Sequence, residues 1–191
     1  MQLILASASP RRRQLLEEAG YEFSVKPAEL DETVPQGVYP PDFAQKLACD
    51  KAEAVARQFP EDVILAADTI VTFGDQILGK PANADEARRM LALLSRTTHI
   101  VITGVCVIRK GGDMVQATRV MSGVRMAALN NEQIEAYVAS GEWQGKAGGY
   151  GIQDNDPLVT RVSGSHTNIV GLPMEVVRRL LGAAGVYAVK K

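Results

Sequence analysis

Residues 3–13 read LILASASPRRR, and this stretch predicts how the chain begins to fold. Residues 3–6 form a short apolar run of the kind that is typical of a buried strand. Ser9 is a helix-capping residue type, and Pro10 is favoured at the first helical position. The helix is expected to end at Gly20, since glycine tolerates the left-handed conformation found at helix C-termini. The stretch therefore predicts a strand that leads directly into a helix.

The junction between this strand and helix has the chemistry of an anion-binding site. Free backbone N–H groups and the helix dipole favour a phosphate at a helix start. Ser7 and Ser9 add hydroxyl donors, while Arg11 and Arg12 add guanidinium groups suited to bidentate phosphate binding. The alternative is a capped helix with a basic first turn, but cations are electrostatically disfavoured there. An anionic ligand explains the pattern better, and Arg13 is expected to be solvated.

The rest of the chain alternates strand and helix patterns without a strict βαβ repeat, which predicts a mixed α/β fold. Strands are predicted at residues 21–25, 63–67, 99–108, 116–126 and 158–162. Helices are predicted from Asp42 to near Pro60, from residue 83 or 84 to 94, from 130 to 139, and from Pro173 onward. The proline-rich loop at 27–41 and the long middle strands suggest two lobes around a cleft.

The composition limits the classes of function. The 191 residues, 46% of them hydrophobic, suffice for one large domain or two small lobes. A formal net charge of -1 argues against nucleic acid or an anionic membrane as partner. No targeting segment or membrane span is visible, so a cytoplasmic location is expected. Cys49 and Cys106 form neither a disulfide framework nor a metal-ligand spacing, and His99 and His166 are expected to be structural.

Lys51 interrupts an apolar helical stripe. One face of the helix predicted from Asp42, at i, i+3, i+4 spacing, carries Ala44, Leu47, Ala48, Lys51 and Val55. A lysine in such a stripe either extends along a neighbour to water or points its ammonium into a pocket against a carboxylate or phosphate. The sequence leaves both interpretations open.

Two acidic residues are candidates for metal binding or proton transfer. Asp68 follows the apolar run 63–67, so its carboxylate is expected at a cleft edge where strands end. There it can bind a divalent metal or take a proton from water, although a turn aspartate bonded to Thr69 is the alternative. Glu32 belongs to the acidic segment 29–32, which by itself indicates a solvated loop.

Two further segments are candidates for nucleotide binding. Lys80 precedes Pro81, which favours an extended backbone and presents a cation from a loop. The segment 145–153 reads GKAGGYGIQ, in which glycines permit close approach to a nucleotide, but it matches no phosphate-binding fingerprint. Gln153 can read a base edge because an amide is both donor and acceptor, or it can lie exposed in a turn.

Short motifs also recur in a characteristic order along almost the whole chain. They are LASASPRR (5–12), LA (47–48) with KA (51–52), ADT (67–69), GKP (79–81), YV (137–138), KAG (146–148) with YGIQ (150–153), and NIVGLP (168–173). Together they resemble the Maf family of nucleoside-triphosphate pyrophosphatases. Several motifs in family order are far more specific than any one of them.

The resemblance implies a single domain over residues 1–191, with a mixed curved sheet, flanking helices and two lobes around a deep cleft, similar to inosine-triphosphatase-like enzymes. It implies hydrolysis between the α and β phosphates, with Mg²⁺ or Mn²⁺ as cofactor, and a homodimer as the assembly. Asp68 corresponds to the family's proton acceptor, and we predict that Asp68 and Glu32 together position the metal. The matching polar cleft residues are Ser7, Arg11, Arg12, Glu32, Lys51 and Lys80.

Three positions point to a branch of that family. Arg11, Thr69 and Gln153 are the residue types of the branch acting on dTTP and UTP, which are therefore the expected substrates, with modified pyrimidine nucleotides as an extension. Residues 154–156 replace glycines of many members of that branch, which can alter base preference. The alternatives are the same chemistry on 7-methyl-GTP or another base, a nucleotide-binding regulator of cell division and septum formation, and a sugar-phosphate phosphatase.

Overall fold

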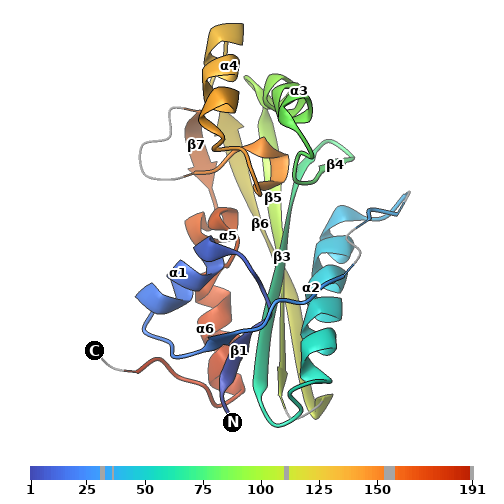
Figure 1. The fold of residues 1–191 in the computed structure, drawn as a ribbon, viewed down its shortest axis with the longest axis vertical. Coiled ribbons are helices and arrows are strands. Elements are labelled where there is room, and N and C mark those ends of the chain that lie inside the picture. Colours follow the sequence, from blue (N-terminus) through green and yellow to red (C-terminus); the bar gives the residue numbers. More distant parts are fainter. Residues whose placement is uncertain (31–32, 36, 110–111, 153–157, 190–191) are drawn as a thin grey trace.

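The computed structural model describes the chain except residues 31–32, 36, 110–111, 153–157 and 190–191 (Figure 1). Its strands are β1 (Leu3–Leu5), β2 (Ser24–Val25), β3 (Val63–Phe73), β4 (Gln76–Leu78), β5 (Thr98–Arg109), β6 (Met114–Met126) and β7 (Val159–Ser163). Its helices are α1 (Pro10–Glu18), α2 (Pro40–Ala56), α3 (Ala84–Leu94), α4 (Asn131–Ser140), α5 (His166–Val170) and α6 (Met174–Ala183), with a 3₁₀ turn, η2 (Ala147–Gly149).

One mixed sheet connects these elements in the order β2-β1-β3-β5-β6-β7, and β4 pairs with β3. β1 is parallel to both β2 and β3, whereas β3, β5, β6 and β7 pair antiparallel in succession. The three long strands β3, β5 and β6 extend well past β1 and run through most of the height of the molecule in Figure 1. The predicted mixed α/β class is confirmed.

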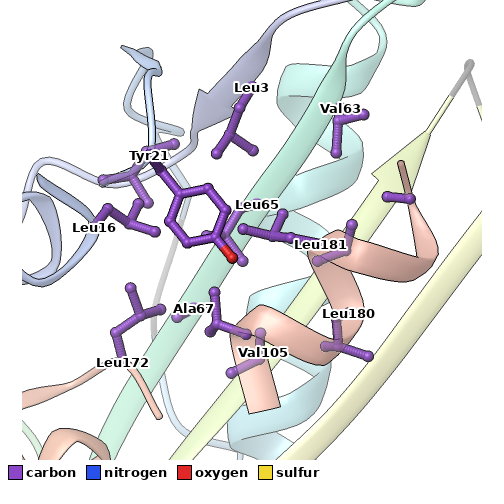
Figure 2. Close-up of a cluster of buried hydrophobic side chains, with 14 of the residues drawn as sticks. Leu3, Leu16, Tyr21, Val63, Leu65, Ala67, Val105, Leu172, Leu180 and Leu181 are labelled. Atoms are coloured by element: carbon purple, nitrogen blue, oxygen red, sulfur yellow. The ribbon is translucent and has the colours of Figure 1, made fainter. Parts of the chain in front are cut away.

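Side-chain alternation along the strands builds a separate apolar cluster on each face of the sheet. Leu5 and Leu65 point to the face covered by α1 and α6, where Figure 2 shows side chains from both strands and helices directed toward one another. Ile4 and Ile64 point to the opposite face and pack beneath α2. Figure 1 shows α2 on one side of β3 and α1 and α6 on the other.

A third cluster covers the end of the sheet that extends past β1. Val71, Val101 and Val124 from the three long strands pack there with Leu91 of α3 and Val138 of α4. The helices thus gather in two groups along the long strands, with α1, α2 and α6 near β1 and α3 and α4 at the far end (Figure 1).

α2 packs very closely against the sheet at Gly104 of β5. A Cβ built on Gly104 would lie 2.1 Å from the carbonyl oxygen of Ala44 in α2, so a larger residue does not fit. Gly104 is also the register partner of Asp68 on β3. The close approach therefore places α2 directly over the strand pair that carries Asp68.

Several predicted element boundaries are wrong. The helix expected to start at Asp42 starts at Pro40, with Tyr39 in the N-cap position, and ends at Ala56 rather than near Pro60. Proline suits the first turn of a helix because the N–H groups there have no intrahelical partner. The strand expected at 21–25 is confined to β2, and α5 was not predicted at all.

The prediction that Asp68 follows the end of a strand is also wrong. β3 continues to Phe73, since residues 69–73 (TIVTF) are β-branched or aromatic and fit a pleated surface. Its pairing with β5 runs on through Thr72 and Ile100. Asp68 therefore lies in the middle of a long strand, and its carboxylate faces α2 because side chains alternate.

The two thiols, though distant in the sequence, lie in one packing cluster between α2 and β5. Cys106 is buried and Cys49 is half-buried, and both are free thiols. A hydrogen bond with Cys49, together with burial, raises the pKa of Cys106. In the part of the chain that the structure describes, no helix has both the length and the apolarity to cross a bilayer.

Candidate active site

A cavity of about 570 Å³ collects most of the residues singled out from the sequence. Its charged part is defined by six polar and charged side chains: Ser7, Arg11, Arg12, Lys51, Asp68 and Lys80. Its apolar part is defined by six others: Val71, Val101, Tyr150, Ile152, Ile169 and Val170. The residues of the apolar part all belong to the apolar cluster beneath α3 and α4. The cavity therefore combines a cationic region with a hydrophobic one, as a phosphorylated organic ligand requires.

A buried ion pair stands in the charged part. Nζ of Lys51 on α2 lies 2.5 Å from Oδ1 of Asp68 on β3, and each residue is only 6% exposed. Of the two interpretations left open for Lys51, the structure therefore bears out the ammonium that points into a pocket against a carboxylate. Asp68 retains a second carboxylate oxygen, Oδ2, with lone pairs of its own for a proton or a cation.

Arg12 ties three elements together at the start of α1. Its Nε donates to the Gly171 carbonyl oxygen at 2.8 Å, its Nη1 to Ser7 Oγ at 2.9 Å and its Nη2 to Thr69 Oγ1 at 3.0 Å. Thr69 Oγ1 also lies 3.0 Å from Thr103 Oγ1 on β5. The sequence suggested Arg12 as a phosphate ligand, but it gave no sign of this structural network.

The cap predicted for α1 is confirmed. Ser9 is the N-cap residue and accepts from the backbone N–H of Arg12, with Pro10 next in the helix. Ser7 is 8% exposed, and its Oγ accepts from the backbone N–H of Ser9 as well as from Arg12. Arg13 is exposed and pairs with Glu17, as expected of a solvated residue.

Arg11 reaches from α1 toward the segment before η2. Its Nη2 donates to the Gly145 carbonyl oxygen at 3.4 Å, a contact between residues far apart in the sequence. Burial lowers the pKa of Arg11, and Tyr137 of α4 offsets part of the effect. The guanidinium nevertheless stays protonated in a protein, so it keeps a positive charge in the cavity lining.

The remaining candidates divide into those inside and those outside the described residues. Thr69 lines the cavity on the face of β3 opposite to Asp68, because neighbours on a strand alternate. Lys80 follows β4 on an exposed stretch and also lines the cavity. Glu32 and Gln153 lie outside the described residues, so the metal-binding and base-reading roles suggested for them stay predictions.

Asp68 is the residue of the charged part with the chemistry to bind a divalent cation, because its carboxylate lines the cavity. Among the described residues, no group of three or more His, Cys, Asp or Glu side chains is arranged to hold a metal ion. Mg²⁺ in nucleotide enzymes is commonly bound by one or two carboxylates together with phosphate oxygens. The Asp68 carboxylate, which lines the cavity, fits that mode.

Residues 2–184 match the model of the Maf-like protein family. The chain belongs to this family. The dTTP/UTP pyrophosphatase of Cereibacter sphaeroides is 49% identical over 97% of this chain and 96% of its own length. A dTTP/UTP pyrophosphatase of Sphingopyxis alaskensis is 48% identical over 96% of this chain and 97% of its own.

Among solved structures, the Staphylococcus aureus Ham1 protein aligns with this Maf protein over 66% of the chain and 72% of its own. That alignment has 12% identity and a TM-score of 0.44. The family membership therefore rests on the sequence matches along nearly the full chain.

Proposed function

We propose that this Maf protein hydrolyses dTTP and UTP to the nucleoside monophosphate and pyrophosphate. Relatives at 48–49% identity over nearly the whole chain bear the name dTTP/UTP pyrophosphatase. The single observation that carries the proposal is the Asp68 carboxylate, held by Lys51 in a cavity whose charged part also contains Arg11, Arg12 and Lys80. A carboxylate among cations can take a proton while its neighbours bind phosphate.

In the proposed reaction, a water oxygen bonds to the α phosphorus and the bond from that phosphorus to the α–β bridging oxygen breaks. Asp68 accepts a proton from the attacking water, and the bridging oxygen leaves with the pyrophosphate. Lys51 holds the carboxylate by its Oδ1 and thereby orients it. Proton acceptance by a positioned carboxylate typically accelerates such a step by about 10² to 10⁴-fold.

The cations of the charged part act on the phosphate chain. Positive charge fixed near the leaving pyrophosphate stabilises the charge that develops as the bond breaks. Lys80 and Arg11 line the cavity and are proposed to contact phosphate oxygens, while Arg12 fixes the turn that carries Ser7. Mg²⁺ or Mn²⁺, held by Asp68 and substrate phosphates, with Glu32 as a further proposed ligand, would supply additional charge neutralisation when bound.

Release of pyrophosphate from a nucleotide panel by the purified protein tests the proposal. We expect turnover of dTTP and UTP in the presence of Mg²⁺ and a loss of about 10³-fold in kcat for Asp68→Asn, which removes the proton acceptor but keeps its shape. Asp50→Asn on the same helix as Lys51 is the matched control, because Asp50 pairs with the exposed Lys46. Wild-type turnover by Asp68→Asn would show that the role given to Asp68 is wrong.

The same panel separates the alternatives. Preferential turnover of 7-methyl-GTP would change the proposed base, and orthophosphate in place of pyrophosphate would indicate a phosphatase. Nucleotide binding without turnover would favour a regulator. The proposed compartment is the cytoplasm, where nucleoside triphosphates are made and used, and the proposed homodimer is tested by the mass of the protein in solution.

A further inference from the structure

A buried polar pair lies behind the apolar part of the cavity. Nε2 of His99, near the start of β5, is 2.5 Å from the hydroxyl oxygen of Tyr150, which follows η2. The two rings meet edge to face, with centroids 5.2 Å apart and planes at 82°. His99 is 1% exposed and Tyr150 is 4% exposed, so no bulk water competes for their hydrogen bond.

His99 is held as a neutral imidazole. Burial lowers the pKa of His99 to about 4, so the ring carries no charge at neutral pH. Its other nitrogen, Nδ1, is buried and has no hydrogen-bond partner among the described residues. An unpaired buried acceptor is tolerated more readily than an unpaired N–H. We therefore assign the proton to Nε2, which donates to the Tyr150 hydroxyl.

Tyr150 in turn belongs to the cavity lining, whereas His99 does not. The main chain before Tyr150 is packed tightly: Gly148 has a φ of 71°, and a Cβ there would lie 3.1 Å from the Val71 side chain. The hydrogen bond from His99 therefore fixes Tyr150 within a segment that has little room to shift.

This segment continues into the apolar part of the cavity. Ile152, two residues after Tyr150, lines it together with Val101 of β5. The base of a nucleoside presents two flat faces that pack well against apolar side chains, whereas the triphosphate is highly charged. The apolar part is thus the region of the cavity with the chemistry to take the nucleoside, and the charged part has the chemistry to take the phosphates.

We propose that His99 is a positioning residue, which acts through Tyr150 to set the wall that holds the nucleoside and thereby the choice of base. The inference rests on the proposed function, because it assigns the nucleoside end of the same substrate to that wall. His99 contributes no contact to the substrate itself. Its removal therefore affects nucleoside recognition and leaves the chemistry of the charged part in place.

His99→Phe and Tyr150→Phe test the proposal, since each removes the hydrogen bond and retains a ring. For each variant we expect KM for dTTP and UTP to rise about tenfold, the size of one lost hydrogen bond. We expect kcat to stay within about threefold, and the preference for dTTP over GTP to narrow. The double variant should raise KM no more than either single variant does, because both changes remove the same hydrogen bond.

Inhibition by inorganic tripolyphosphate distinguishes a local effect on the nucleoside wall from a general loss of structure. A general loss of structure would raise its inhibition constant, whereas the proposed effect would not. Tripolyphosphate can occupy the charged part only, so its inhibition constant should stay within about twofold of wild type in both variants. His99→Gln, whose amide places an N–H donor near the position of Nε2, should restore much of the nucleotide KM. Tyr187→Phe is the matched control, because Tyr187 is 73% exposed.

Three outcomes would overturn the inference. One is an unchanged nucleotide KM in both single variants, and another is an equal shift for tripolyphosphate and nucleotide. The third is failure of His99→Gln to improve on His99→Phe while both fold, as judged by their circular dichroism. Absence of wild-type turnover would contradict the proposed function instead, and calorimetric titration with dTTP and GTP would then test the nucleoside wall by binding alone.

Discussion

The two parts of the cavity are built by different physical means. In the charged part, ionic groups hold one another in place, as in the Lys51–Asp68 pair and the bonds from Arg12 to three separate segments. In the apolar part, the lining is hydrophobic, and its orientation depends on a neutral polar pair behind it. In the charged part, the same side chains line the cavity and hold one another in place. In the apolar part, Tyr150 lines the cavity, and His99, which holds it in place, lies behind it.

This difference has a consequence for mutation. A change in the charged part is expected to affect stability and catalysis together, because a buried charge that loses its partner is costly. A change behind the apolar part is expected to act on KM and on the preference between bases, with a small effect on kcat. Variants of the two parts should therefore fall into two groups when unfolding free energy is compared with kinetic constants.

The largest effect on stability is expected for Lys51→Met. The variant leaves Asp68 buried without its partner, so we expect a loss of about 3 kcal/mol in unfolding free energy and about 10²-fold in kcat/KM. Urea unfolding and pyrophosphate release measure the two effects. Lys46→Met is the control on the same helix, because Lys46 is exposed and its pair with Asp50 is worth little. A second change, Asp68→Asn, should return part of the lost stability.

Gly104→Ala probes the contact that places α2 over β3. The added methyl group would meet rigid backbone at Ala44 rather than a movable side chain, so we expect a loss of about 2 to 3 kcal/mol. Because α2 carries Lys51, kcat should fall as well. Gly182→Ala is the control, since its Cβ would meet only Tyr187 at an ordinary 3.7 Å and alanine favours a helix. Equal stability of both variants would contradict the close packing described for α2.

Arg12→Ala should show that Arg12 supports the fold, in contrast to the exposed Arg13 beside it. Loss of the charged hydrogen bonds to Ser7, Thr69 and Gly171 is expected to lower unfolding free energy by about 2 kcal/mol. Arg13→Ala, which removes only an exposed pair with Glu17, should change it by less than about 0.5 kcal/mol. If both variants unfold at the same urea concentration, Arg12 does not cross-link these segments in solution.

The smallest effect is a pH dependence of stability that comes from His99. Its pKa is lowered to about 4 in the folded protein from an ordinary value of 6.5, so the unfolded chain binds more protons between these values. The contribution of neutral, buried His99 to the unfolding free energy is therefore fully present above pH 6.5. It decreases as pH falls toward 4, and the unfolding free energy drops by about 1.5 kcal/mol from pH 6.5 to pH 5. Urea unfolding at several pH values measures it.

Two variants isolate this titration, since the chain has only two histidines. His99→Phe should flatten the slope between pH 5 and pH 6.5, while His166→Gln should keep it because His166 is exposed. The same slope in all three proteins would mean that His99 is accessible to protons in the folded state.

The sequence was sufficient where a residue contradicted its local context. Three features departed from their local pattern: the arginines at the start of a helix, the lysine in an apolar stripe and the aspartate after an apolar run. All of these segments reached the cavity, with Arg13 alone exposed, as expected. The error on Asp68 arose because an apolar run does not indicate where a strand ends; the partner strand β5 decided that.

By itself, the sequence determined the mixed α/β class, most of the elements, the capped start of α1 and the set of charged candidates, because these follow from local patterns and residue chemistry. Only the tertiary structure decided which groups meet. The Lys51–Asp68 pair, the bonds of Arg12 and the His99–Tyr150 pair join segments distant in the chain. Such contacts depend on strand register and on the approach of helices to the sheet, which no local pattern encodes.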